Sequence, residues 1–285
     1  MQPPSASNVD ASLQGKVCLV TGANSGIGKA TALALARRGA SVVMLCRDQT
    51  RAETARAEIQ AASGKEAVEI LLADLSSHAS LRSAVTEFQS KHSQLNVLVN
   101  NAAVFKPTRT VTSEKLETMF ATNHLGPFLL TNLLLNQLRA SAPARILVVT
   151  APSTVAPNFD DLQGEKRFSA LGSFGASKMC NLLFTYELAR QLAGTGITVN
   201  AVHPGIVKSP LMKEAPPPLR WLTALIGTSP EKAAETLAYL ASSPDVANVT
   251  GNFFKDKRAI DSNAYSHNEQ VQHRLWEVSM ALTEM

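Results

Sequence analysis

The sequence predicts a single α/β domain built on a doubly wound parallel sheet with helices on both faces. Short apolar runs, most of them β-branched, alternate with longer amphipathic runs from Val17 to Val202. This is the pattern of strands buried on both faces and of the helices that cover them. The chain has 285 residues, of which 45% are hydrophobic, so one sizeable core can form. No linker, repeat or low-complexity tract divides the middle of the chain.

The expected strands and helices follow one another in strict alternation. The strands are Val17–Thr21, Ser41–Leu45, Val68–Leu72, Val97–Val99, Ile146–Thr150 and Thr198–Val202. The helices are Gly28–Arg38, Ala52–Ala62, Ser80–Lys91, Ser113–Gln137 and Phe174–Ala193. Alternation of this kind implies right-handed crossovers, which place helices on both faces of a parallel sheet.

The two ends of the chain are less regular than its middle. Residues 1–13 are mostly polar and are expected to form a flexible tail, which leaves 14–285 as the single domain. Beyond His203 the alternation loosens. The segment 208–228, with successive prolines at 216–218, is either a substrate lid or a surface loop.

Composition excludes several classes of protein. Lys and Arg are spread along the chain despite a net charge of +4, so no basic stripe predicts nucleic-acid binding. No apolar run is long enough to span a bilayer, and the N-terminus does not have the pattern of a secretory signal. The scattered cysteines Cys18, Cys46 and Cys180 have no metal-ligand spacing and fit a reducing compartment. We therefore expect a cytoplasmic protein without a metal site.

A glycine-rich segment, TGANSGIG at 21–28, follows the first strand and opens the first helix. Gly22 permits a tight turn, Gly26 lets the backbone approach a ligand, and Gly28 allows the helix to pack closely. Free N–H groups at the start of the helix can then hold a pyrophosphate. The segment therefore predicts a Rossmann-type dinucleotide site.

The end of the second strand indicates which dinucleotide binds. An NAD site usually carries an acidic residue about 20 residues after the glycines, where it bonds the ribose 2′-hydroxyl. Here the strand ends in Cys46, and Arg47 follows it. A guanidinium suits the 2′-phosphate, so NADP(H) is the predicted cofactor. The alternative interpretation is that Arg47 is a solvated loop charge.

The motifs together resemble the short-chain dehydrogenase/reductase family over residues 14–260, and TNHLGPFLLTNLLL and DLQGEK resemble its retinol-dehydrogenase-like branch. Further matches are ADL at 73–75, NNAA at 100–103, Asn123 within TNHLG, and HPG at 203–205. The resemblance implies cofactor contacts from Gly22, Asn24, Ser25, Gly26, Ile27, Gly28, Arg47, Asp74, Leu75, Asn101, Ala102, Ala103, Lys178, Pro204, Gly205 and Val207. His124 and His203 lie inside family motifs and are expected to serve packing rather than catalysis.

The resemblance also implies a catalytic tetrad of Asn, Ser, Tyr and Lys, of which two positions match. Asn123 and Lys178 are present, whereas Phe174 stands at the Tyr position, four residues before Lys178. Aligned on the usual Val-Ser-Ser strand ending, Ala151 stands at the Ser position. Because a phenyl ring has no proton to transfer, we expect a defective proton relay and poor reduction of ordinary ketones.

Three functions remain open at this point. The favoured one is an oxidoreductase acting on a hydrophobic small molecule that needs no Tyr acid, such as an iminium ion or a conjugated C=C bond. The alternatives are a non-redox cyclase or isomerase that uses the same cleft, and a pseudoenzyme that binds NADP(H). By family analogy, a homodimer or homotetramer is expected to form through the helices at Ser113–Gln137 and Phe174–Ala193.

Overall fold

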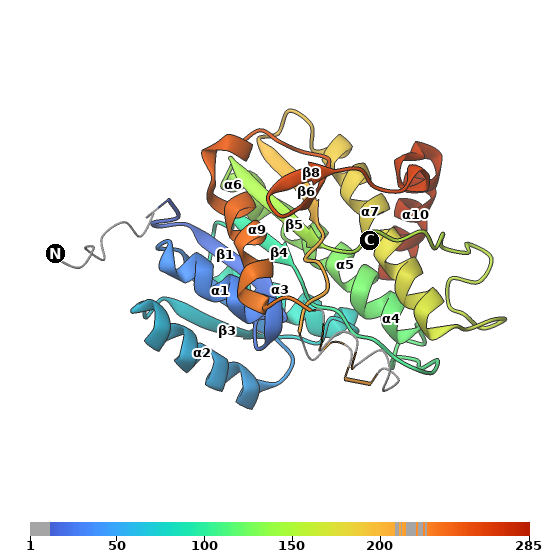
Figure 1. The fold of residues 1–285 in the computed structure, drawn as a ribbon, viewed down its shortest axis with the longest axis horizontal. Coiled ribbons are helices and arrows are strands. Elements are labelled where there is room, and N and C mark those ends of the chain that lie inside the picture. Colours follow the sequence, from blue (N-terminus) through green and yellow to red (C-terminus); the bar gives the residue numbers. More distant parts are fainter. Residues whose placement is uncertain (1–11, 209–210, 212, 215–220, 222–224, 226) are drawn as a thin grey trace.

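A sheet of eight strands runs through the domain, in the spatial order β3-β2-β1-β4-β5-β6-β7-β8 (Figure 1). The computed structural model describes residues 12–208, 211, 213–214, 221, 225 and 227–285. The strands are β1 (Val17–Thr21), β2 (Ser41–Cys46), β3 (Val68–Leu72), β4 (Val97–Asn100), β5 (Ala144–Val149), β6 (Ile197–Val202), β7 (Asn252–Lys255) and β8 (Arg258–Ile260). All neighbours pair in parallel except β8, which is antiparallel to β7. The predicted fold class is confirmed.

Helices cover both faces of this sheet. On one face lie α1 (Gly26–Arg37), α2 (Gln49–Ser63) and α9 (Pro230–Ser242), and on the other lie α3 (His78–Lys91), α5 (Gly126–Leu133) and α7 (Ala170–Gln191). The shorter elements are α4 (Thr118–Phe120), the π-helical turn η1 (Ala121–Leu125), α6 (Leu135–Ala140), η3 (Pro244–Val246) and η4 (Ala264–His267). The last helix, α10 (Glu269–Thr283), packs on α7 and η1 (Figure 1). Two buried apolar clusters, one on each side of the sheet, form the main core.

The six predicted strands are all present, with ends that differ by two residues or fewer. The prediction stopped at Val202 and therefore missed β7, β8, α9 and α10. The two strands have weak local patterns: β8 has three residues, and β7 pairs with β6 only after a long excursion of the chain. Their positions are set by pairing across the sheet rather than by local periodicity.

The single helix predicted over Ser113–Gln137 is wrong, because the structure breaks it into α4, η1, α5 and α6. Helical structure begins after Glu117, whose carboxylate accepts hydrogen bonds from the N–H groups of Met119 and Phe120. The π-helical turn then widens the helix just before Gly126, where an added Cβ would lie 2.4 Å from the carbonyl oxygen of Leu75. The irregular turn thus occurs where the helix comes closest to the loop after β3.

The boundaries of the domain follow from burial. Leu13, which was predicted to lie in the tail, is buried, and its N–H donates to the carbonyl oxygen of Arg38. The packed domain therefore begins no later than Leu13; residues 1–11 lie outside the described residues. The same is true of much of the predicted lid segment at 208–228.

No helix in the described part of the chain is long and apolar enough to cross a membrane.

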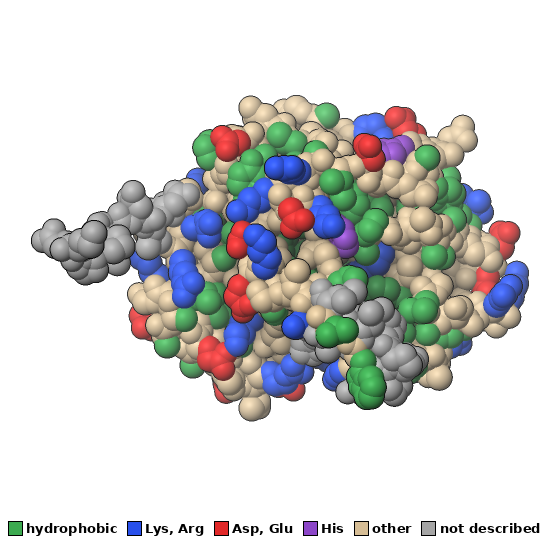
Figure 2. Space-filling model, in the orientation of Figure 1, with side chains coloured by type: hydrophobic (Ala, Val, Ile, Leu, Met, Phe, Trp, Pro, Cys, Tyr) green, Lys and Arg blue, Asp and Glu red, His purple; other side chains and the backbone are tan. Residues whose placement is uncertain are grey.

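The surface charge is mixed. On the face shown in Figure 2, Lys and Arg side chains alternate with Asp and Glu side chains. No basic stripe of the kind that binds nucleic acid stands out on this face.

Candidate functional site

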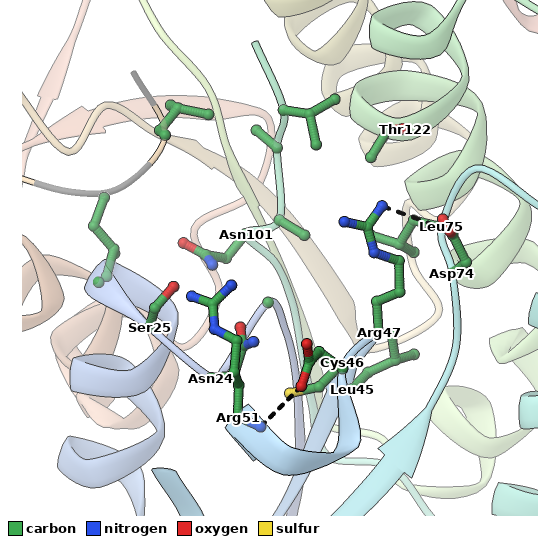
Figure 3. A pocket seen from close by; sticks show the side chains of 18 of the residues that line it. Asn24, Ser25, Leu45, Cys46, Arg47, Arg51, Asp74, Leu75, Asn101 and Thr122 are labelled. Carbon is green, nitrogen blue, oxygen red and sulfur yellow. Dashed lines mark hydrogen bonds and ion pairs between the residues drawn. The ribbon is translucent and has the colours of Figure 1, made fainter. Parts of the chain in front are cut away.

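The carboxyl ends of the parallel strands open into one cleft (Figure 3). This edge of the sheet lies where the strand order reverses between β1 and β4, the place where ligands bind in open α/β sheets. The predicted cofactor residues that line the cleft are Gly22, Asn24, Ser25, Gly26, Ile27, Arg47, Asp74, Leu75, Asn101, Ala102 and Ala103. The cleft residues that the prediction missed include Arg51, Val104, Phe105, Thr122, Leu211, Lys213 and Glu214.

The glycine loop has a backbone that only glycine adopts readily. Gly22 has φ +66° and Gly26 has φ +52°, both in the left-handed region. Gly28 has a different role, because an added Cβ there would lie 2.3 Å from the carbonyl oxygen of Gly22 and 2.6 Å from Nδ2 of Asn101. Gly28 therefore allows the helix to pack against the loop and does not itself line the cleft.

The first backbone N–H groups of α1 have no side-chain cap. Its N-cap residue is Ser25, whose side chain accepts no hydrogen bond from the helix. By contrast, α2, α3, α7, α9 and α10 each begin under a capping side chain: Asp48, Ser77, Ser169, Ser229 and Asn268. An uncapped helix N-terminus that faces a cleft leaves N–H groups and a positive partial charge for an anion.

Thr21 connects the glycine loop to the loop after β4. Its Oγ1 accepts hydrogen bonds from the N–H groups of Asn101 and Ala102, each at 2.9 Å. The Asn101 side chain returns a hydrogen bond from Nδ2 to the carbonyl oxygen of Thr21, also at 2.9 Å. These bonds fix two walls of the cleft relative to each other, which makes the cavity preformed.

Two arginines project into the cleft, Arg47 from the loop after β2 and Arg51 from α2 (Figure 3). Arg47 Nη1 lies 3.7 Å from Oδ2 of Asp74, and 72% of the Arg47 side chain is exposed. Arg51 stands in the first turn of α2, where its N–H bonds the capping Asp48 carboxylate at 2.9 Å. Arg47 was predicted from the sequence and Arg51 was missed, although the Asp48 cap could have indicated that Arg51 lies one helical turn beyond Arg47.

The position where an NAD site carries an acid is apolar here. Cys46 ends β2, is buried, and lines the cleft. Burial raises the pKa of its thiol to about 11, so the thiol stays neutral at physiological pH. No negative charge from this residue therefore faces the two guanidinium groups.

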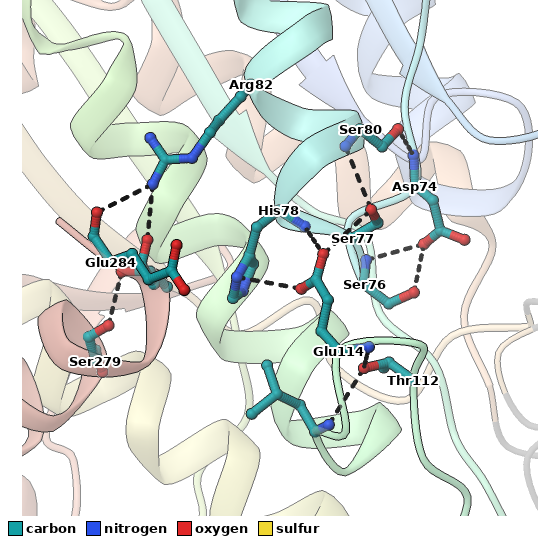
Figure 4. Close-up of polar contacts among 12 residues, drawn as sticks. Asp74, Ser76, Ser77, His78, Ser80, Arg82, Thr112, Glu114, Ser279 and Glu284 are labelled. Atoms are coloured by element: carbon teal, nitrogen blue, oxygen red, sulfur yellow. Dashed lines mark hydrogen bonds and ion pairs between the residues drawn. The ribbon is translucent and has the colours of Figure 1, made fainter.

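Asp74 is held by its own loop (Figure 4). Its Oδ1 accepts from the N–H and the hydroxyl of Ser76, at 2.9 and 2.7 Å, and its N–H donates to Oγ of Ser80 at 3.0 Å. Oδ2 makes only the long contact to Arg47 among the described residues. The carboxylate is thus fixed in orientation with one oxygen directed toward the cleft.

Asn123 lies on the π-helical turn and is fully buried. Its Oδ1 accepts from the N–H of Val104 at 2.8 Å, and its Nδ2 donates to the carbonyl oxygen of Val104 and to Oγ of Ser177, both at 3.1 Å. Ser177 in turn donates to the carbonyl oxygen of Phe174. Asn123 therefore joins the loop after β4 to the segment of α7 that carries Phe174 and Lys178.

Lys178 and Phe174 lie one turn apart on α7, with the Lys178 ammonium 5.3 Å from the centre of the phenyl ring. Lys178 is 5% exposed. Burial lowers the pKa of its ammonium to about 8, because desolvation disfavours the charged form. The ammonium thus lacks an acidic partner among the described residues and is easily perturbed by an anion bound nearby.

The end of β5 lies beside this turn of α7. Thr150 Oγ1 donates to the carbonyl oxygen of Lys178 at 2.7 Å, so its hydroxyl is used in packing the strand against the helix. Ser153 is buried, and its Oγ accepts from the N–H of Val155. Ala151, between them, is partly exposed. The Thr150 hydroxyl is therefore already used as a donor, and the Ser153 hydroxyl stands two residues beyond position 151.

The cleft becomes apolar towards Phe174. Phe105 lines the cleft and meets the Phe174 ring edge-on, with the ring centres 5.8 Å apart. Both belong to a small apolar cluster that also contains Met119, Phe168 and Leu211. Phe174 thus forms part of the wall next to the apolar end of the cleft.

The remaining predicted residues lie near the cleft without lining it. Pro204, Gly205 and Val207 follow β6 at the same edge of the sheet, and Val207 forms a bridge with Thr228. His203 donates its N–H to the carbonyl oxygen of Phe254, which fits a packing role. His124 is completely buried, and burial lowers its pKa to about 4.

A glycine loop, an uncapped helix N-terminus and a cleft at the strand ends define a dinucleotide-binding α/β protein. The model of the short chain dehydrogenase family matches residues 16–219, and this chain belongs to that family. It is 40% identical over 279 residues to mouse retinol dehydrogenase 12, covering 95% of this chain and 87% of that protein.

Two solved structures share the fold. The 3-ketoacyl-(acyl-carrier-protein) reductase from Brucella melitensis, complexed with NADH, is 29% identical with a TM-score of 0.67, covering 85% of this chain and 96% of that one. The Pseudomonas aeruginosa RhlG/NADP active-site complex is 27% identical with a TM-score of 0.71, covering 87% and 96%.

Proposed function

We propose that this protein binds NADP(H) in the cleft and transfers hydride to a hydrophobic small molecule whose reduction requires no proton donor from the protein. The observation that carries the cofactor assignment is the pair of guanidinium groups, Arg47 and Arg51, beside a neutral Cys46. A 2′-phosphate would gain charge-assisted bonds from either arginine. A free ribose hydroxyl would find no acid at position 46.

The cleft has the features that a nicotinamide dinucleotide requires. The uncapped start of α1 would hold the pyrophosphate, and Asp74 would face the adenine side. Lys178 would hold the ribose at the nicotinamide end, where its ammonium has no other anionic partner among the described residues. The cofactor supplies the hydride when bound. A relative with NADH and one with NADP bound support a nicotinamide cofactor of either kind.

The proton relay is proposed to be defective. Phe174 occupies the position of the family tyrosine and Ala151 that of the serine, so neither can donate to a substrate oxygen. Asn123 keeps its hydrogen bonds to Val104 and Ser177. We infer that this chain orders a substrate against an apolar wall without polarising a carbonyl.

An electron-poor substrate fits such a site best. An iminium ion already carries the positive charge that a proton donor would otherwise supply, and a conjugated C=C bond can take up hydride at carbon. The ring of Phe174 beside Phe105 favours a flat, hydrophobic molecule.

The three cysteines are buried and free, which is consistent with a reducing compartment, and we propose the cytoplasm.

The test is a calorimetric comparison of NADPH and NADH, followed by absorbance assays with a ketone, an enone and an iminium ion. We expect NADPH to bind at least about tenfold more tightly. Oxidation of NADPH is expected with the enone or the iminium ion. Equal affinities for the two cofactors would contradict the assignment.

The outcomes also separate the alternative functions. Conversion of a substrate without cofactor consumption would identify a cyclase or isomerase. Tight NADPH binding without turnover of any substrate class would favour a pseudoenzyme. The absence of the phenol at position 174 is the feature that keeps both alternatives open.

A further inference from the structure

Lys178 is the only lysine among the described residues whose side chain is buried. A buried lysine normally pairs its ammonium with a carboxylate. Within the part of the chain that the structure describes, no carboxylate forms an ion pair with Lys178 and no group forms a hydrogen bond with its Nζ. The contact that the structure does show is with the ring of Phe174, whose centre lies 5.3 Å from Nζ. The amine is therefore buried without a polar partner of its own.

The backbone that carries this amine is fixed. Thr150 Oγ1 donates to the carbonyl oxygen of Lys178 at 2.7 Å. In the preceding turn, Ser177 Oγ donates to the carbonyl oxygen of Phe174 and accepts from Nδ2 of the buried Asn123. These bonds hold the turn of α7 from two sides and leave the Lys178 side chain out of the network. The amine is positioned but not engaged.

The nitrogen is not closed off from solvent. The unpaired atoms His124 Nδ1 and Asn181 Oδ1 are fully enclosed, whereas Lys178, 5% exposed, has a nitrogen that is not among such enclosed atoms. The ring that it contacts is half-buried and packs edge-on against Phe105, which lines the apolar end of the cleft. A flat molecule that packs on the Phe174 ring would thus lie close to this amine.

Burial also makes the amine reactive. It lowers the pKa of Lys178 to about 8, so roughly a tenth of the side chain is a neutral amine at pH 7. Neutral, desolvated lysines in apolar pockets are the ones that attack carbonyl carbons and form Schiff bases. With Phe174 and Ala151 on either side, neither of these two neighbours supplies a hydroxyl that could occupy the nitrogen.

We propose that Lys178 condenses with a flat, conjugated aldehyde, and that the resulting iminium ion is the acceptor of the hydride. This inference rests on the proposed function, which supplies NADPH as the reductant, and it names the substrate class. Conjugation is required because hydride added to the imine carbon itself would leave the lysine permanently alkylated. Hydride added to the β-carbon leaves a product that can be released.

The steps balance. The ammonium of Lys178 and the aldehyde form a protonated imine and water, the C=O bond being replaced by C=N. Hydride adds to the β-carbon of the conjugated C=C bond, and the electron pair moves to nitrogen to give an enamine. The α-carbon then takes a proton from water, and hydrolysis of the imine releases the saturated aldehyde and the lysine. The sum is one enal, one NADPH and one proton converted to one saturated aldehyde and NADP⁺.

The first experiment traps the Schiff base without cofactor. The full-length protein is incubated with cinnamaldehyde, reduced with sodium borohydride and mapped by peptide mass spectrometry. The expected adduct adds the mass of the aldehyde less one oxygen atom, which distinguishes it from addition of a cysteine to the C=C bond. We expect at least about tenfold more of it on Lys178 than on the exposed Lys65. Equal labelling of the two lysines, or none on Lys178, would overturn the proposal.

The second experiment follows the hydride. With NADPH and cinnamaldehyde, the parent should form 3-phenylpropanal, whereas direct reduction of the carbonyl would give cinnamyl alcohol. Lys178→Arg keeps a positive charge but cannot form an imine, so both the adduct and the turnover should fall by at least about a hundredfold. Lys65→Arg is the matched control and should change neither. If Lys178→Arg does not fold, the peptide map and the product of the parent still decide.

The outcomes separate this inference from the proposed function. Formation of 3-phenylpropanal with no adduct on Lys178 would overturn the role of the lysine and leave the hydride transfer standing. An adduct on Lys178 without oxidation of NADPH would overturn the hydride step, and with it the proposed redox function. Cinnamyl alcohol as the product would overturn the iminium route.

Discussion

The ammonium of Lys178 lies 5.3 Å from the centre of the Phe174 ring, one turn away on the same helix. The same ring packs edge-on against Phe105, which lines the apolar end of the cleft. A tyrosine here would place a phenol next to the lysine, and the lysine charge would lower the pKa of that phenol. With phenylalanine, the lysine keeps its position and has no acid to influence.

Lys178 should make cofactor binding depend on pH. Burial lowers its pKa to about 8, so its charge is present below pH 8 and is lost as the pH rises through that value. If a bound anionic cofactor keeps the lysine protonated, the Kd for NADPH should rise about tenfold between about pH 7 and pH 9. Lys178→Met should bind more weakly and show a flat profile. A flat profile in the unmodified protein would contradict this role.

Arg47 and Arg51 should determine the preference for NADPH. Arg47→Ala is expected to weaken NADPH binding by about tenfold to a hundredfold, the value of a charge-assisted hydrogen bond, and to leave NADH nearly unchanged. Arg51→Ala should act in the same direction. Arg139→Ala removes an equal charge on the exposed end of α6, away from the cleft, and serves as the control. Calorimetry with both cofactors checks the prediction; parallel losses for NADPH and NADH would count against it.

Gly26→Val should abolish cofactor binding. The substitution places a branched side chain where the backbone must meet the pyrophosphate, at a residue with φ +52°. Gly64→Val is the matched control, because Gly64 has φ +67° at the end of α2 with nothing within 4 Å of an added Cβ. Both variants should lose stability, and only Gly26→Val should lose NADPH binding. A Gly26→Val protein that folds and binds NADPH like the parent would show that the loop does not hold the cofactor.

His124 should destabilise the fold in acid. Its folded-state pKa of about 4 is well below the ordinary histidine value of 6.5, so the unfolded chain takes up the proton first. The contribution of the neutral His124 to the free energy of unfolding is therefore fully present above about pH 6.5. It falls by up to about 3 kcal/mol as the pH decreases towards 4. Urea unfolding of His124→Gln should show less of this loss, whereas His273→Gln, at the exposed His273, should retain it. Identical pH profiles for the parent and His124→Gln would rule out this effect of His124.

The alternating strands and the glycine loop could be predicted from sequence because their signals are local. Buried parallel strands are runs of apolar residues, and Gly22, Gly26 and Gly28 stand at fixed spacing between a strand and a helix. The π-helical turn at Asn123 could not be predicted in this way. It depends on the close approach of Gly126 to the Leu75 carbonyl, a contact between segments 51 residues apart.

The same limit explains what was missed elsewhere. Arg51 lies in the first turn of α2, which begins at the Asp48 cap, and the pattern of apolar residues alone does not indicate that this turn lines the cleft. The packing of α10 on the domain depends on Trp276 meeting Phe128 on α5 and Phe184 on α7, which are far from it in the sequence. Local periodicity identifies a helix but does not state what lies on its outer side.

The most direct test of the central claim measures ketone reduction with NADPH by the parent protein and by the double variant Ala151→Ser, Phe174→Tyr. Ketones of several sizes should be used, and Phe168→Tyr, which adds a phenol elsewhere in the same apolar cluster, serves as the control. We expect almost no ketone reduction by the parent and the control, and a gain of at least about tenfold in the double variant, because each hydroxyl stabilises charge that develops in the transition state. Efficient ketone reduction by the unmodified protein would show that another group delivers the proton, and it would contradict the role assigned to Phe174.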